Sequence, residues 1–288
     1  GDEKGRLEAV TFRYESNGND VIELDGSSSY FADADALRSY EVAYDMVKNA
    51  VTRFKRDAAT FELPITISAE TPDEGARLLD RMQLAFDHDV RLGNPGRIVL
   101  DGYYAQAFVT TFGLSCEEMH GLFEITTRAT VLLPDPVWIN ERTVEFNIDP
   151  GSDAVNGLNY PHDYPYDYAG GVYVSKLVNS LSWPCAVRIV VYGPASNPYL
   201  HIGDNRYEVD VEVPDGGMLV IDGLDKSKIE LRDQYGRAEN VFSKRIPGIP
   251  GSGTYIFEEV PPGHHAITWD GTFRLDVTLL GERSWVPC

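Results

Sequence analysis

The chain has 288 residues, a formal net charge of -20 at pH 7 and an apolar share of 43%. That apolar share is enough for packed cores and excludes a disordered tail, and the length is a soft prior for two domains. The charge argues against DNA or RNA binding by the whole surface, because an acidic protein repels nucleic-acid phosphate. No stretch comes near the roughly 20 consecutive apolar residues that a transmembrane helix needs.

The chain has few cysteines, and their spacing does not indicate a disulfide framework. Cys116, Cys185 and Cys288 are far apart and odd in number. This pattern predicts neither a disulfide scaffold nor a metal-binding knuckle, so we expect free thiols and synthesis in a reducing compartment. The first six residues are not followed by an apolar segment, so no secretory signal is expected.

The first part of the chain alternates short strand signals with turn residues. Apolar residues at every second position predict half-buried strands, and a proline inside a strand predicts an edge or a bulge. In chain order the pattern predicts strands at 7–14 and 21–24, a loop at 27–35, and strands at 40–46 and 61–67, the last with Pro64 inside it.

One helix is well signalled. Thr71 provides an N-cap, Pro72 suits the first helical position, and Glu74 completes the cap three residues on. We expect the helix to end near His88. An apolar stripe at helical spacing follows the cap and predicts the buried face; it consists of Leu78, Leu79, Met82, Ala85 and Phe86.

Strands return after the helix. A strand is expected at 97–100, and Asp101-Gly102 turns it back into a second strand at 103–111. A strand at 122–133 completes this half. Strands, one helix and more strands make an α+β pattern, which predicts an antiparallel sheet or small barrel that carries a single helix.

The composition changes after residue 139. Residues 140–180 are rich in proline, glycine and tyrosine, which predicts a linker or arm that is ordered by contact. From residue 181, alternating strands such as 206–213 and 273–279 predict a self-contained β-sandwich. Asp270-Gly271 is expected to make a tight hairpin between its last two strands. The chain is therefore divided into 1–139, a 140–180 arm and 181–288.

No segment predicts a reaction, a cofactor or a metal ion. A structural metal site needs about four convergent ligands. Three segments fall short of that number: Asp87-His88-Asp89, His162-Asp163 with Asp167, and His264-His265. Cys116 lies near His120, but we expect a loop there and not a protease dyad. With no nucleophile elbow, phosphate-binding loop or zinc-protease motif, no catalytic, cofactor-binding or metal-binding residue is assigned.

Carbohydrate chemistry stays open at this point. A glycosidase needs two carboxylates that face each other across a cleft, which spacing along the chain cannot show. Six aromatic residues could stack against sugars, although we expect most of them to be core or interface residues. They are Tyr192, Tyr199, Tyr207, Tyr235, Tyr255 and Trp269.

The order of these features resembles the distal tail proteins of long-tailed bacteriophages. In the first half the resemblance lies in the order strand, helix, hairpin, which ends in an extended segment at 127–138. In the second half it lies in the segments 190–198, 218–222 and 260–263. The arm at 160–168 is also similar to linkers of that family.

The resemblance implies a mainly β fold with an α+β first domain. That domain would be a split β-barrel with one helix, similar to tail-tube proteins, and residues 181–288 would form a galectin-like β-sandwich. It implies a non-enzymatic structural protein at the virion tail tip, made in the host cytoplasm. No galectin sugar-binding residue can be matched to this sequence, so glycan binding is not carried over.

The resemblance also implies partners. A homohexameric ring would join the tail tube protein to the tail-tip hub protein and carry receptor-binding or side-fibre proteins. DNA would pass through the lumen without specific binding, and a negative wall would help its passage. The resemblance implies no cofactor and no membrane insertion. The alternatives are a carbohydrate-binding adhesion module on a virion or cell surface, and a carbohydrate-active enzyme with a β-sandwich accessory module.

Overall fold

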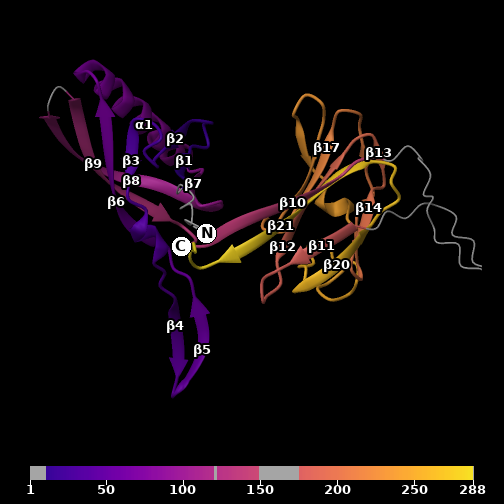
Figure 1. Cartoon of the computed structure of the whole chain (residues 1–288). Coiled ribbons are helices and arrows are strands. Elements are labelled where there is room, and N and C mark those ends of the chain that lie inside the picture. The colour runs from indigo at the N-terminus through magenta and orange to yellow at the C-terminus, as the bar shows by residue number, and fades with distance from the viewer. Residues whose placement is uncertain (1–10, 120–121, 149–174, 288) are drawn as a thin grey trace, which may run out of the picture. The chain divides into compact units, whose positions relative to one another are not determined.

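The computed structural model describes residues 11–119, 122–148 and 175–287. This part of the chain is mainly β with one α-helix, as the sequence predicts. It forms two compact units, which we call the first and second units (Figure 1). The first unit comprises the described residues up to Asn140 together with those from Glu282 onward, and the second unit is Glu141–Gly281.

The first unit has two sheets that share one long strand. One sheet has the strand order β2-β1-β7-β8-β10, and β3-β6-β9-β8 forms the other. The described ladder does not close into a barrel: β2 and β3 are not paired, and an isolated bridge joins Asp25, which follows β2, to Phe31 of β3. The elements are β1 (Phe12–Glu15), β2 (Val21–Glu23), β3 (Tyr30–Ala32), the 3-10 helix η1 (Asp35–Arg38), β4 (Ala43–Val47), β5 (Ala50–Lys55), β6 (Ala59–Ala69), α1 (Pro72–Leu92), β7 (Gly96–Leu100), β8 (Tyr103–Met119), β9 (Leu122–Leu133) and β10 (Trp138–Phe146), which continues into the second unit.

Helix α1 begins as predicted and ends later. The Thr71 side chain accepts a hydrogen bond from the Glu74 backbone N–H at 3.2 Å, which is the expected N-cap. The predicted stripe faces the sheets, where Met82, Ala85 and Phe86 are buried. The expected end near His88 is wrong: the helix continues until Gly93, whose left-handed φ of 65° closes it.

Asp89 is fully buried and receives hydrogen bonds from the strand and turn at the start of the unit. Tyr14 donates its hydroxyl to Oδ2 at 2.6 Å, and Ser16 Oγ and the Asn17 N–H each donate to Oδ1 at 2.9 Å. Burial raises the pKa of Tyr14, and the hydrogen bond and charge of Asp89 raise it further. The phenol therefore stays a donor at neutral pH, and β1 is fixed to α1.

Gly96 is required by the same cluster. A Cβ at this position would lie 2.5 Å from the Tyr14 hydroxyl, 2.6 Å from Asp89 Oδ2 and 2.7 Å from the Glu15 carbonyl oxygen. These distances are far inside van der Waals contact. The start of β7 can approach the buried carboxylate this closely only because it has no side chain.

Two predictions for the first unit are wrong in part. Residues 27–35, expected as a loop, contain β3, which pairs with β6 along Tyr30–Ala32. β8 extends past residue 111 to Met119, because β9 provides a partner along its length, so residues 115–119 form a strand and not a loop. Pro64 fits its expected edge position, since β3 pairs with β6 only from Ile65 onward.

The second unit is a β-sandwich around one core. Its sheets have the orders β19-β18-β17-β12-β21-β10 and β11-β20-β14-β15, and β13 pairs with β16. Buried residues of both sheets share a single cluster, including Ile189, Val277, Leu200 and Ile267. The elements are β11 (Ser175–Asn179), β12 (Ala186–Tyr192), β13 (Ala195–Ser196), β14 (Tyr199–Ile202), β15 (Asn205–Glu208), β16 (Glu212–Val213), β17 (Met218–Asp222), β18 (Ile229–Arg232), β19 (Ala238–Asn240), the 3-10 helix η2 (Phe242–Lys244), β20 (Gly263–Thr268) and β21 (Arg274–Arg283).

The Asp270-Gly271 step is not a hairpin. It does turn the chain, with Gly271 at φ 76° and Asp270 Oδ1 accepting from the Thr272 N–H at 3.1 Å. However, β20 pairs with β11 and β14, whereas β21 pairs with β12. The step therefore carries the chain from one sheet to the other.

The division of the chain differs from the predicted one at two places. The predicted arm at 140–180 contains most of β10 and all of β11, and its residues 149–174 lie outside the described part. The tail after Gly281 groups with the first unit and not with the sandwich. Val286 is buried in the first core, and Arg38 donates to the Pro287 carbonyl at 2.7 Å.

Replacing Asp89 with alanine should lower the free energy of unfolding by about 3 kcal/mol, because several buried donors lose a charged acceptor at once. Asp87→Ala is the matched control on the same helix. Asp87 is half exposed and pairs with Arg91, so its loss should cost less than about 0.5 kcal/mol. Urea unfolding followed by circular dichroism measures both. Equal losses would contradict a structural role for the buried carboxylate.

Gly96→Ala should destabilise the chain by about 1–3 kcal/mol, because the added methyl group overpacks a closed site. Gly113→Ala is the control, since a Cβ at Gly113 meets nothing within 4 Å among the described residues. The control should be neutral or slightly stabilising. Thermal unfolding of the two variants compares them directly, and a neutral Gly96→Ala would show that β7 can move away from Asp89.

Candidate functional site

The residues tested for metal or acid-base chemistry do not come together. Asp89 points into the core, whereas Asp87 pairs with Arg91 on the outer face of α1. His264 and His265 point to opposite faces of β20, as expected, and His265 Nε2 lies 2.8 Å from the Pro261 carbonyl. The described residues hold no group of three or more His, Cys, Asp or Glu side chains arranged for a metal ion.

Some of the sequence candidates lie outside the described residues. These are His120, the segment His162-Asp163 with Asp167, Cys288 and the side chain of Cys116. Cys185 is a buried thiol whose Sγ lies 3.2 Å from Asn179 Oδ1. Among the helices that the structure describes, none is long and apolar enough to cross a membrane.

The six aromatic residues of the second unit do not form a common platform. Tyr207 and Trp269 are buried in the core. Tyr192 donates to Asp276 at 2.7 Å, and the Arg206 guanidinium lies over the Tyr199 ring at 4.3 Å. Tyr255 packs against the core, and Tyr235 is 79% exposed.

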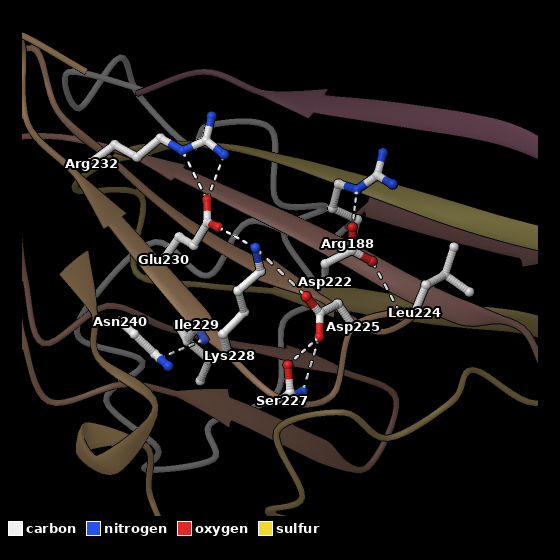
Figure 2. Close-up of polar contacts among 10 residues, drawn as sticks. All are labelled: Arg188, Asp222, Leu224, Asp225, Ser227, Lys228, Ile229, Glu230, Arg232 and Asn240. Atoms are coloured by element: carbon white, nitrogen blue, oxygen red, sulfur yellow. Dashed lines mark hydrogen bonds and ion pairs between the residues drawn. The ribbon is translucent and has the colours of Figure 1, made fainter. Parts of the chain in front are cut away.

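A charged face covers β12, β17 and β18 of the second unit (Figure 2). Arg188 donates to Asp222 and to Glu141, each at 2.9 Å. Burial opposes its charge, but the two carboxylates outweigh burial and raise its pKa. Glu230 accepts from Lys228 and from Arg232 at 2.5 Å, so its pKa is lowered. The charges of this face therefore pair with one another within the second unit.

The hairpin of β4 and β5 stands apart from the sheets of the first unit. In Figure 1 it extends away from them, and among the described strands its two members pair only with each other. Lys48 and Asn49 make the turn, with Lys48 at φ 56°. An ion pair of 2.7 Å between Lys55 and Asp45 joins the two strands. A two-stranded hairpin is marginal in water without a further partner.

The hairpin has one apolar face. Tyr44 lies opposite Phe54, and Met46 opposite Val51, with a bulge at Thr52 between the two pairs. Directly opposed residues share a face, and alternation on β4 puts both pairs on the same one. We call this set the apolar face of the hairpin; its exposed fractions are 59% for Tyr44, 51% for Met46, 46% for Val51 and 69% for Phe54.

The hairpin also differs in charge from the rest of the chain. Residues 43–56 contain four bases, Lys48, Arg53, Lys55 and Arg56, and one acid, Asp45, in a chain with 45 acidic and 25 basic residues. A basic segment on an acidic protein is attracted to acidic surfaces. An exposed apolar face beside such charges makes the hairpin the candidate interaction site of the first unit.

The comparisons with known proteins concern the fold. No protein-family model and no curated protein sequence matches the chain. Among solved structures, the distal tail (Dit) protein of phage SPP1 matches at 10% identity and a TM-score of 0.51, over 96% of this chain and 100% of that one. The chain has the fold of a phage distal tail protein.

Baseplate structures support the same Dit-like fold. Chains of the phage p2 baseplate in its activated conformation, with Ca or with Sr, match at 10% and 11% identity. Each match has a TM-score of 0.59 and covers 97% of this chain and 100% of the other. The likeness therefore extends over both units of the Dit-like chain. At this identity it concerns the backbone, and individual side-chain roles do not follow from it.

The sequence missed most of the β4–β5 hairpin of this Dit-like chain. It placed a half-buried strand at 40–46, whereas β4 lies at Ala43–Val47 and is exposed, and β5 was not predicted. The bulge at Thr52 breaks the alternation that would identify β5. The signal that could have identified β5 was the β-branched and aromatic content of the segment after a turn at Asn49.

Replacing both Met46 and Phe54 with serine should change the free energy of unfolding by less than about 0.5 kcal/mol. The reason is that these side chains bury little apolar surface within their own chain. Leu63→Ala, on the buried face of β6, should cost about 2–5 kcal/mol. Urea unfolding of both variants tests the contrast. A large loss in the serine variant would mean that the hairpin packs on its own unit.

Proposed function

We propose that this chain is a structural protein of the tail tip of a long-tailed phage. The observation that carries the proposal is the Dit-like fold, which extends over both units. The matched SPP1 protein is described as a paradigm of the hub adsorption apparatus of phages that infect Gram-positive bacteria. The matched p2 chains belong to a baseplate. The place of action is then the tail tip of the virion.

The proposed assembly is a homohexameric ring between the tail tube and the tail-tip hub. The first unit would form the ring, as a tail-tube-like domain. The second unit would be a galectin-like peripheral domain that carries receptor-binding or side-fibre proteins. Six copies of a chain with charge -20 would give DNA a repulsive, non-binding lumen if the acids line it.

The proposed role is non-enzymatic. Asp89 is the one buried charged residue in the described part of the chain, and three donors hold it in a structural cluster. A sugar-reading role for the second unit is not proposed, because Tyr235 is the one member of its six candidate aromatics that is mostly exposed.

Negative-stain imaging of the purified full chain tests the ring. We expect six-fold particles with a central hole wide enough for duplex DNA, and light scattering should give the mass of six copies of the 32.1 kDa chain. A tail tube protein added in excess should stack on one face of the ring. A chain that forms no ring, either alone or with a tube protein, would contradict the proposal.

A further inference from the structure

Among the residues that the structure describes, the apolar face of the hairpin has no partner within its own chain. None of its four residues belongs to the hydrophobic core of the first unit, which closes without them. Both strands have a free edge, and edges of this kind pair with other chains unless something covers them. No described residue of the same copy covers this face, which leaves it open to a second molecule.

The first unit also holds a hollow of complementary character. It has a volume of about 520 Å³ and is lined by Phe31, Asp25, Asp33 and Asp35, among others. Phe31 is 55% exposed, so an apolar ring lies open beside three carboxylates. Arg38 is the one basic residue of the lining, and it is already paired with Asp101 at 2.7 Å. The free charge of the hollow is thus negative.

The hairpin and the hollow match in both respects. The hairpin offers large apolar side chains, and with Lys55 already paired to Asp45 its remaining bases are Lys48, Arg53 and the flanking Arg56. The hollow offers an apolar ring and three acids. Within one copy the two stay apart, since the apolar face is exposed. The complementary surface that the first unit offers to the hairpin is therefore the hollow of a second copy.

We propose that the β4–β5 hairpin of one copy docks its apolar face over the Asp25–Phe31–Asp35 hollow of the next copy. The inference rests on the proposed ring and names the contact that builds it. Each copy contributes one hairpin and one hollow, so the contact is head-to-tail. Contacts of that type close into rings when the rotation between copies allows it.

Photo-cross-linking of the full-length chain tests the contact. A benzophenone amino acid replaces Phe54, and equal amounts of ¹⁴N- and ¹⁵N-labelled chains are mixed, so that links between copies carry both isotopes. We expect mixed-isotope links from position 54 to peptides within 25–38. The same probe at Tyr235, which is also exposed but lies in the second unit, should give no such link.

Charge reversal provides an independent arm of the test. Arg53→Glu with Arg56→Glu should weaken self-association at least about tenfold, and so should Asp35→Lys, because each puts like charges across the contact. Mixing the two variants should restore much of the assembly, since every reversed hairpin can then meet a reversed hollow. Analytical ultracentrifugation measures all three samples, and unchanged unfolding transitions exclude misfolding as the cause.

The outcomes separate the contact from the function. Links from position 54 to another region, links within one copy alone, or a chain that stays monomeric at its highest soluble concentration would overturn the inference. So would hairpin variants that assemble normally. If those variants still form rings that bind a tail tube protein, the contact is wrong and the proposed function stands. If the unaltered chain neither forms a ring nor binds the tube, the proposed function fails as well.

Discussion

The first unit depends on one buried carboxylate. A charged group removed from water must be hydrogen-bonded, and Asp89 meets this need with Tyr14, Ser16 and the Asn17 N–H. Those donors come from β1 and its turn, so the bonds fix the first strand to the last turns of α1. Gly96 lets β7 close over the same point. With this cluster formed, the core is complete, and it includes no residue of the β4–β5 hairpin.

Local features were predictable and long-range pairing was not. The cap at Thr71 and the strand at 122–133 follow from residues that are neighbours in sequence, and both are confirmed. Asp89 was missed as a core residue because a stripe is identified by its apolar members, although its spacing from Phe86 continues the buried face. Asp270-Gly271 shows the other limit. Turn chemistry fixes a bend, but the sheet that the next strand joins depends on residues far along the chain.

The hairpin combines a correct pattern with a wrong expectation. Alternation in 40–46 indicated one buried face, and the structure does place Tyr44 and Met46 on a common face. The error lay in what covers it, because nothing in the same chain does so among the described residues. The sequence pattern is typical of a buried face, whereas the structure leaves this face exposed. The two observations agree if the covering surface belongs to another molecule.

The energetics of the two surfaces assign them different roles. The charges around Arg188 and Glu230 in the second unit already have partners within the unit, and an exposed surface ion pair is worth about 0–1 kcal/mol. The apolar face of the hairpin is different, because fully burying one large apolar side chain gains about 1.5–3 kcal/mol. Four such side chains, each roughly half exposed among the described residues, represent several kcal/mol that a covering surface would gain. If the chain assembles as proposed, the larger apolar gain lies in the first unit, because the charges of the second unit already pair with one another.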